Sequence, residues 1–294
     1  MTAKLPITLL RGFGQIMLQE NAATGLLFLA GITWASPLMG LAALLAVCCG
    51  TLTAHLLRFG KENTEQGLYG FSAALVGVAL VLFRGHGPFV WLAVIAGSAL
   101  AAALQHVFIK RKIPVFTLPF VLVTWLLLLL LPVPVEAVST PLPTVPGGPL
   151  IAALVRGFGQ VIFQSDLLAG LLFLVAVAVN SRIAALFGIA GALLAAVIAL
   201  GSAAPETTVE MGLWSYNAVL CAIAFAGTKP RNLVLSLISV PLAVLIGLAW
   251  REEFLPQFTF PFVAAACISL LLEYVLHKVI KWGGRASGGG RPAL

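Results

Sequence analysis

The sequence predicts an all-α polytopic membrane protein built from two inverted repeats, each with five transmembrane helices and one re-entrant segment. Composition is the first observation behind this prediction. Hydrophobic residues make up 61% of the 294 residues and charged residues only 9%, whereas soluble domains are about 45–50% apolar and about 25% charged. So few charges cannot cover a surface that faces water, and we therefore expect a lipid bilayer around most of the chain.

A duplicated segment is the second observation. Residues 11–29 read RGFGQIMLQENAATGLLFL and residues 156–174 read RGFGQVIFQSDLLAGLLFL, so that 11 of 19 aligned positions are identical at a separation of 145 residues. Two further pairs follow in the same order, the second at a separation of 142: Glu65–Gly77 with Glu210–Ala222, and Pro114–Phe120 with Pro256–Phe262. Two similar halves in so apolar a chain indicate a membrane pathway where the repeats meet.

The lengths of the apolar runs predict how each half crosses the bilayer. The first half has a short run at Pro6–Leu18 and then five others: Ala22–Ala35, Pro37–Leu57, Gly70–Phe83, Pro88–Phe108 and Val115–Leu131. The second half repeats this order from Leu150–Phe163 to Phe258–Leu276. A spanning helix needs about 20 residues, so we expect Gly70–Phe83 and its counterpart Ser215–Phe225 to be re-entrant. This gives ten spans in total. Because each half has an odd number of spans, the second repeat has the opposite orientation in the membrane to the first.

These runs also predict the domain boundaries. We expect a first membrane repeat at 1–131, a proline-rich linker at 132–149 that cannot be helical, a second repeat at 150–282 and a glycine-rich basic tail at 283–294. Basic residues lie near both ends of the chain, which places both termini in the cytoplasm and agrees with an even number of spans. Basic residues beside apolar runs are typical of topology determinants, and nucleic-acid binding is not expected.

Ionisable residues in or beside the apolar runs are few. Carboxylates inside a membrane are usually functional, yet no paired series of carboxylates or histidines runs through the predicted spans. The chain has no HExxH motif, and its four cysteines lie in apolar runs without metal-site spacing, so we expect buried thiols, no metal and no cofactor. No nucleophile or metal constellation suggests an intramembrane enzyme. An ion-coupled secondary transporter remains an alternative, with Asp166 or Glu273 as its coupling residue.

Neutral residues are what both halves share in place of charges. Three matched pairs occur in the same order: Gln15 and Gln160, Phe71 and Tyr216, and Thr117 and Thr259. Taken singly, such residues more often tie helices together or pack in the core, but a pseudo-two-fold axis would bring all three pairs to a common midplane. Aromatic faces beside acceptor oxygens suit a small, flat, neutral molecule with many N–H donors, and urea fits this description.

The duplicated RGFGQ segments, the pair GLYGFSAALVG and GLWSYNAVLCA, and the pair PVFTLPF and PQFTFPF resemble the urea transporter family over essentially the whole chain. The resemblance implies a multi-pass homotrimer of the bacterial plasma (inner) membrane, in which urea moves passively through a separate pore in each protomer. It places Gln15 and Gln160 in a narrow filter and Thr117 and Thr259 at a central constriction. It also implies that the filter has flat walls, formed by Leu18 and Phe163 and then by Phe71 and Tyr216. Leu75 and Leu220 would lie close to these walls.

The chain departs from the family pattern at several of these positions. Leu18 stands where an aromatic residue is common and leaves one wall of the slot aliphatic, while Ser72 replaces the asparagine that Asn217 retains. These departures concern selectivity and not the fold. A channel for other short amides, ammonia or water therefore stands as the first alternative, beside the ion-coupled transporter.

Overall fold

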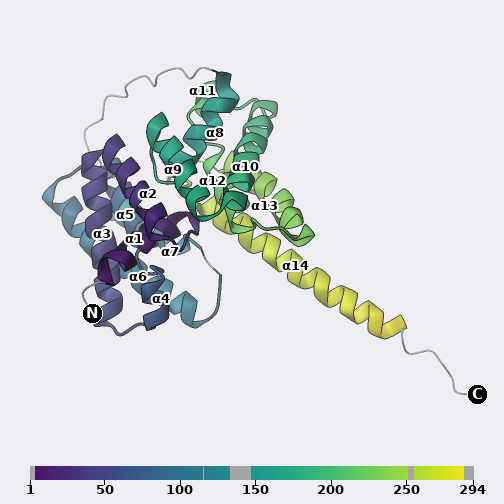
Figure 1. The fold of residues 1–294 in the computed structure, drawn as a ribbon, viewed down its shortest axis with the longest axis horizontal. Helices are drawn as coiled ribbons and strands as arrows, with labels where there is room; N and C mark the ends of the chain where they lie inside the picture. The colour runs from purple at the N-terminus through teal and green to yellow at the C-terminus, as the bar shows by residue number, and fades with distance from the viewer. Residues whose placement is uncertain (1–3, 115, 133–146, 251–254, 288–294) are drawn as a thin grey trace, which may run out of the picture.

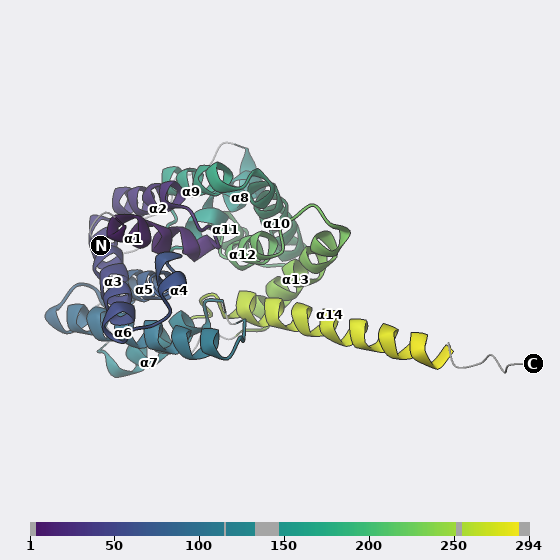
Figure 2. The same ribbon diagram turned by 60° about the horizontal axis from the view of Figure 1, so that its bottom comes forward.

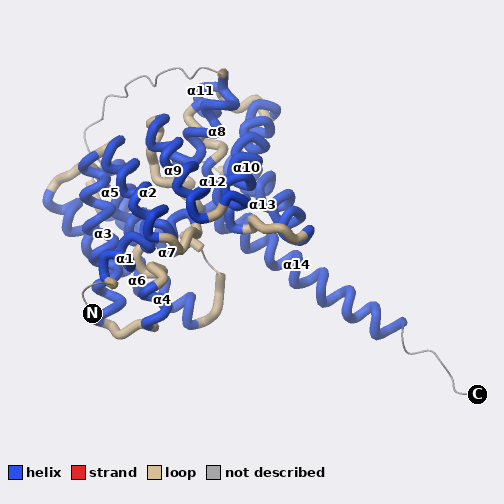
Figure 3. The backbone as a smooth tube through the Cα atoms, in the orientation of Figure 1, coloured by secondary structure: helices blue, strands red, loops and turns tan. Residues whose placement is uncertain are grey.

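The described residues of this chain form helices and loops without any strand (Figure 3). The structure is a computed structural model of the 294-residue chain, in which residues 4–114, 116–132, 147–250 and 255–287 are described. The all-α class predicted from composition is therefore confirmed over these residues.

The described residues of the two halves form seven equivalent α-helices each, in the same order (Figure 1), and the first half has one additional 3₁₀ helix. The first half comprises α1 (Leu5–Gly14), the short 3₁₀ helix η1 (Gln15–Met17), α2 (Ala22–Ala35), α3 (Pro37–Leu56), α4 (Lys61–Glu65), α5 (Phe71–Arg84), α6 (Pro88–Lys110) and α7 (Leu118–Leu130). The second half comprises α8 (Gly148–Gln160), α9 (Leu167–Asn180), α10 (Arg182–Gly201), α11 (Glu206–Glu210), α12 (Tyr216–Ala224), α13 (Pro230–Ala249) and α14 (Phe260–Ser287). The sequence repeat is therefore also a repeat of structure.

Five described helices are long and apolar enough to cross a membrane, namely α3, α6, α10, α13 and the part of α14 from Phe260 to Lys278. A sixth span is possible if α1 with η1 and α2, which meet at a bend of 76°, count as one broken span. Helices α5, α7 and α9 are apolar but shorter, with 13 or 14 residues. These lengths support a polytopic membrane protein, while the number of ten spans stays a prediction.

The two segments predicted to be re-entrant are the most enclosed helices of their halves. Every residue of α5 from Phe71 to Val81 is buried, as is every residue of α12 from Tyr216 to Ile223. Helix α5 packs on α3, α6 and α7, and α12 packs in the same way on α10, α13 and α14. A helix that is apolar on all sides belongs inside protein, which explains why these two short helices need not reach across a bilayer.

Equivalent residues also begin equivalent helices. Ser36 and Ser181 lie between consecutive helices with extended backbone, and each side chain caps the following helix. The Ser36 hydroxyl accepts a hydrogen bond from the Met39 amide at 3.3 Å, and the Ser181 hydroxyl accepts one from the Ala184 amide at 3.1 Å. A serine cap satisfies an amide that the first helical turn leaves without a partner, so both halves turn back on themselves at the same place.

The halves meet along α2 and α9, which lie side by side in Figures 1 and 2. Phe28 and Phe173 stand 145 residues apart, and their rings pack edge to face at 5.2 Å between centroids. The Thr24 hydroxyl donates to the Ala176 carbonyl across the same contact at 2.7 Å. Gly31 makes this approach possible, because a Cβ atom there would lie 2.5 Å from the Phe173 ring.

Some equivalent helices of the two halves lie at different places along the molecule. Helices α4 and α11 are equivalent in the repeat, yet they lie at the bottom and the top of the view in Figure 1. Helix α14 continues to Ser287 and extends well away from the helical body in both views.

The predicted linker and tail lie partly outside the described residues, which exclude 133–146 and 288–294. Where the chain is described, α8 already begins at Gly148 and α14 reaches Ser287. Pro149 fits helix α8 because its missing N–H falls in the first turn, where amides have no helical partner.

Candidate solute pathway

The RGFGQ segments end α1 and α8, and their arginines fix how each helix meets the loop before the buried helix. Arg11 Nη1 donates to the Glu65 carbonyl at 3.1 Å, and Arg156 Nη1 donates to the Glu210 carbonyl at 3.1 Å. The loop then passes so close to α1 that a Cβ atom at Gly67 would lie 2.4 Å from the backbone nitrogen of Gly12. Gly67 also has a φ of +82°, which favours glycine.

The two glutamines predicted for the filter are held identically. Gln15 Nε2 donates to the Gln66 carbonyl at 3.1 Å, and Gln160 Nε2 donates to the Met211 carbonyl at 3.0 Å. Both side chains are half-buried, and within the described part of the chain neither Oε1 atom has a hydrogen-bond donor. Each amide is therefore anchored through its nitrogen, and its oxygen remains able to accept a hydrogen bond.

Leu18 and Phe163, the predicted wall residues beside the glutamines, share an unusual backbone. Their φ angles are 61° and 59°, in the left-handed region that side chains other than glycine, asparagine and aspartate seldom adopt. Such strain persists only where the surroundings enforce it, and it often marks functional positions. Leu18 is exposed whereas Phe163 is half-buried, so these two predicted wall residues differ in exposure.

Phe163 lies in an aromatic cluster that the sequence reasoning missed. Its ring packs against Phe83 at 6.3 Å, Phe120 at 6.1 Å and Phe258 at 5.8 Å between centroids, each at a steep angle. The repeated PxFTxPF motifs contain Phe120 and Phe258 and could have pointed to them. Phe83 has no matching aromatic in the second half and gave no such signal.

The PxFTxPF motifs themselves meet. The Thr117 and Thr259 hydroxyls are 2.6 Å apart, and both residues are buried. On either side of this contact, Phe116 packs on Phe262 at 5.0 Å and Phe120 packs on Phe258 at 5.3 Å between centroids. In each motif the threonine contacts the other threonine, and the first phenylalanine contacts the last phenylalanine of the other motif.

The remaining predicted wall residues are enclosed. Phe71 and Tyr216 begin α5 and α12 with 6% and 8% of their surface exposed. The Tyr216 hydroxyl donates to the Phe258 carbonyl at 2.7 Å. Leu75 and Leu220 stand one turn further on and have no exposed surface. Both leucines are therefore enclosed within the helical body.

Ser72 and Asn217 differ in their bonding as well as in their identity. Asn217 Nδ2 donates to the Phe258 carbonyl at 3.2 Å, and its Oδ1 accepts from the Phe262 amide at 3.1 Å. Ser72 Oγ is buried and has no hydrogen-bond partner among the described residues. The asparagine therefore braces the second PxFTxPF segment, while the shorter serine leaves the first one without this brace.

The two carboxylates considered for ion coupling both have structural partners. Asp166 caps α9, where its Oδ1 accepts from the Ala169 amide at 2.9 Å. Glu273 pairs with Arg231, whose Nη2 donates to Oε2 at 2.7 Å. Each carboxylate is thereby accounted for by a helix cap or an ion pair.

The described residues contain no group of three histidine, cysteine, aspartate or glutamate side chains suited to a metal. The expectation of buried thiols was right for Cys221. It was wrong for Cys48, Cys49 and Cys267, which are only half-buried.

The fold and the site together define the class: a polytopic integral membrane transporter in which two similar helical halves meet at matched residues. A family model described as Urea transporter matches residues 7–274. The chain belongs to the urea transporter family.

Curated relatives agree with this assignment. Urea transporter 1 of Ovis aries and that of Capra hircus are each 29% identical over 290 residues, covering 90% of this chain and 76% of the relative. Urea transporter 1 of Rattus norvegicus is 28% identical over 295 residues, covering 93% of this chain and 73% of the relative. The resemblance deduced from the motifs is thereby confirmed, and so is the prediction that the chain is a transporter of urea and not an enzyme.

Proposed function

We propose that the chain is a channel-like passive urea transporter with a narrow filter, lined by aromatic rings and oxygen atoms, in each protomer. The observation that carries this proposal is the matched pair of glutamines. Gln15 and Gln160 hold their amide nitrogens on backbone carbonyls and leave their Oε1 atoms without a described donor. Two acceptors supplied by equivalent residues of the two halves suit a solute with N–H groups at both ends.

Urea matches these acceptors. Urea is planar and neutral, and both of its amide nitrogens carry N–H donors. The groups that bind it therefore need no charge. Removing its water costs several kcal/mol unless new hydrogen bonds replace those lost, and fixed oxygens in the filter would supply them. In this proposal the glutamine oxygens accept from urea, the flat walls exclude bulkier solutes, and the full set of pathway residues is Gln15, Gln160, Leu18, Phe163, Phe71, Tyr216, Leu75, Leu220, Thr117 and Thr259.

The proposed architecture is a pair of inverted repeats with ten spans and both termini in the cytoplasm. Helices α4 and α11 at opposite ends of the view in Figure 1 support the inversion, and so do Phe28 and Phe173, which are equivalent residues in direct contact. The domain division at 1–131, 132–149, 150–282 and 283–294 follows the same repeat. We place this protein in the bacterial plasma (inner) membrane.

A homotrimer is the proposed assembly. Helix α14 exposes apolar side chains on more than one side: Ile268, Leu271, Leu272, Tyr274, Val275 and Leu276. Such a surface must lie against lipid or against another subunit. Neighbouring subunits in a trimer would cover part of it, while each protomer keeps its own pathway.

Flux measurements distinguish this proposal from its two alternatives. Purified protein in liposomes should let urea equilibrate to equal concentrations on both sides, whatever proton or sodium gradient is imposed. Accumulation of urea against its own gradient would instead establish ion coupling. Comparing urea with acetamide, ammonia and water in the same vesicles would identify a channel for another neutral solute, since that channel would pass one of these faster than urea.

A further inference from the structure

A cavity of about 1190 Å³ lies at one end of the first half, between α1, α3 and α4, and contains none of the proposed filter residues. Most of its wall is apolar, with contributions from Leu5, Leu9, Leu52 and Phe59. Leu52 is exposed on the surface of α3. The cavity is therefore a groove on the side of the helical body and not part of the pathway between the halves.

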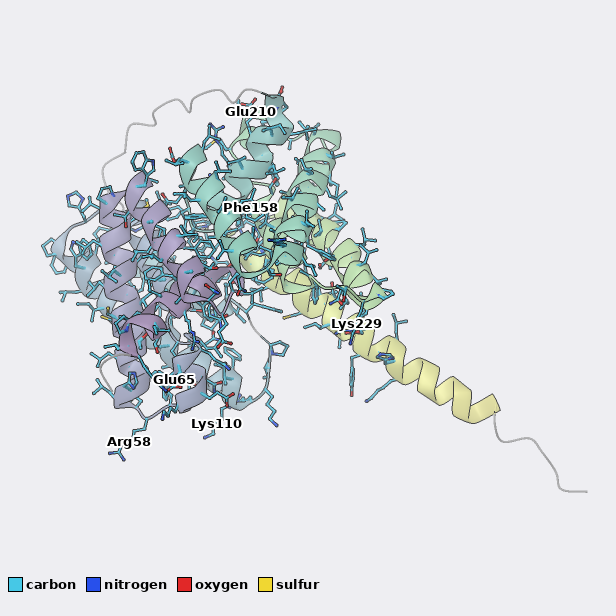
Figure 4. All side chains as sticks on the ribbon, in the orientation of Figure 1. Arg58, Glu65, Lys110, Phe158, Glu210 and Lys229 are labelled. Carbon is cyan, nitrogen blue, oxygen red and sulfur yellow. The ribbon has the colours of Figure 1, made fainter. Side chains whose placement is uncertain are left out.

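Basic side chains surround this groove. Lys4, Arg58 and Lys61 line it together with one carboxylate, Glu65. Lys4 Nζ and Lys61 Nζ lie 3.8 and 4.0 Å from the same oxygen of Glu65, and both lysine side chains are well exposed. Figure 4 shows Arg58 and Glu65 at the same lower end of the first half. Three cations against one carboxylate leave an excess of positive charge beside an apolar groove.

One wall of the groove is held rigidly by an aromatic stack. The Phe59 ring lies flat on His106, with centroids 3.8 Å apart and an interplanar angle of 3°. Tyr69 contacts both rings, and its hydroxyl is 3.1 Å from His106 Nδ1. Because the rings of His106 and Tyr69 both pack on Phe59, this part of the wall is held in place from within the protein.

The second half provides an internal comparison, because its equivalent positions lack the basic residues. Lys4, Arg58 and Lys61 correspond to Pro149, Ala203 and Glu206 at the repeat separation of 145 residues. Arg58 and Ala203 have nearly the same left-handed backbone, with φ angles of 54° and 58°. The repeated fold therefore forms this corner without any cation, and the basic residues of the first half need another explanation.

We propose that the groove binds one anionic phospholipid, with an acyl chain along Leu9, Leu52 and Phe59 and the phosphate among Lys4, Arg58 and Lys61. The apolar lining of the groove favours a lipid over a free anion. The excess of cations favours an anionic headgroup over a zwitterionic one, since basic side chains at the membrane surface attract anionic lipids. This inference concerns a site separate from the proposed urea pathway and does not rest on it.

The same basic residues could instead act only as topology determinants, and a lipid-retention experiment separates the two roles. The full chain is purified in a neutral detergent, mixed with equal amounts of phosphatidylglycerol and phosphatidylcholine, and weighed intact by native mass spectrometry. Wild type should retain phosphatidylglycerol in preference to phosphatidylcholine. The triple variant K4Q/R58Q/K61Q should retain at least about tenfold less of it, because each basic side chain at the surface adds to the attraction for the anionic headgroup.

Two further variants make the test specific. K110Q/R111Q/K112Q removes three exposed cations from the end of α6, which Figure 4 shows at the same end of the first half through Lys110, and it should retain phosphatidylglycerol as wild type does. Leu52→Trp fills the groove without touching a charge and should also lower retention. All variants should keep urea flux and thermal stability, which shows that any loss of lipid does not come from misfolding.

Three results would overturn the proposal. Equal loss in the α6 control would show that surface charge in general attracts the lipid. Equal retention of phosphatidylcholine would reduce the groove to an apolar surface that any lipid can cover. An assembled oligomer that retains no phosphatidylglycerol in wild type would mean that a neighbouring subunit, and not a lipid, covers the groove.

Discussion

The hydroxyl groups of Thr117 and Thr259 lie 2.6 Å apart, and these residues hold the same position in the two PxFTxPF motifs. Phe28 and Phe173, which are also equivalent, pack on each other at 5.2 Å between centroids. Equivalent residues contact one another when two copies are related by a local two-fold axis that passes near both. These two contacts therefore mark the line along which the halves of the chain meet.

The threonine contact predicts a cooperative pattern of stability. Thr117→Val or Thr259→Val should each lower the free energy of unfolding by about 1–3 kcal/mol, because the partner hydroxyl stays buried without its hydrogen bond. The double variant should lose less than the sum of the two single losses. Thermal unfolding of the detergent-solubilised protein measures all three, and additive losses would show that the two hydroxyls do not depend on each other.

The aromatic cluster predicts a change in selectivity. Phe163→Ala and Phe71→Ala should let acetamide pass more readily relative to urea, because each removes a flat face from the proposed slot. Large-to-small aromatic substitutions in a packed core cost about 3–5 kcal/mol, and half-buried Phe163 should cost less than this.

Phe158→Ala is the control for this substitution. Phe158 is fully buried and lies beside Gly188, so its loss should reduce the yield of folded protein while the surviving protein keeps its selectivity. Stopped-flow flux per folded protein gives both quantities. Phe163 and Phe71 would belong to the core if their alanine variants behaved in the same way as Phe158→Ala.

A substitution at Leu18 is expected to increase selectivity for urea over acetamide. Leu18→Phe would place an aromatic ring at the position equivalent to Phe163, and Leu18 already has the same left-handed backbone as Phe163. The ratio of urea flux to acetamide flux should therefore rise without loss of folded protein. A lower ratio at equal folding would indicate that the slot has no room for a second ring and that its aliphatic wall is a requirement.

Substitutions of Asp166 distinguish a role as a helix cap from a role in ion coupling. Asp166→Asn should keep the hydrogen bond to the Ala169 amide, since asparagine caps helices about as well as aspartate, and stability and urea flux should stay near wild type. Asp166→Ala should cost about 0.5–2 kcal/mol of stability with normal flux per folded protein. Loss of flux in the stable asparagine variant would contradict the passive channel and favour ion coupling.

Much of the fold follows from local patterns. The runs expected at Ala22–Ala35 and Pro37–Leu57 match α2 and α3 almost to the residue, because a serine cap and a following proline separate them. The enclosed position of α5 and α12 also follows from their length and apolar character. Pairing across the interface is not local, however, so the contact of α2 with α9 could be expected only from the repeat.

The site was less accessible from the sequence. The matched glutamines were found through the repeat, but their anchoring carbonyls at Gln66 and Met211 belong to loops whose positions only tertiary packing sets. The role of Phe83 as a neighbour of Phe163 has the same origin. The left-handed backbone of Phe163 arises from the turn that ends α8, and no propensity of phenylalanine indicates it.

The central claim is that the two glutamines accept hydrogen bonds from urea. Gln15→Leu and Gln160→Leu each remove an acceptor from the proposed filter, and an unmet hydrogen bond costs about 1–3 kcal/mol. Gln164→Leu is a matched control, because Gln164 also donates to a backbone carbonyl, that of Ile162 at 2.9 Å, but is fully enclosed.

The most direct test is stopped-flow urea flux into liposomes, normalised to the amount of folded protein, for these three variants. The account predicts that Gln15→Leu and Gln160→Leu each slow the flux roughly tenfold to a hundredfold, while Gln164→Leu leaves it unchanged. Unchanged normalised flux in both filter variants would contradict the account. It would show that the glutamines only hold helices and loops together.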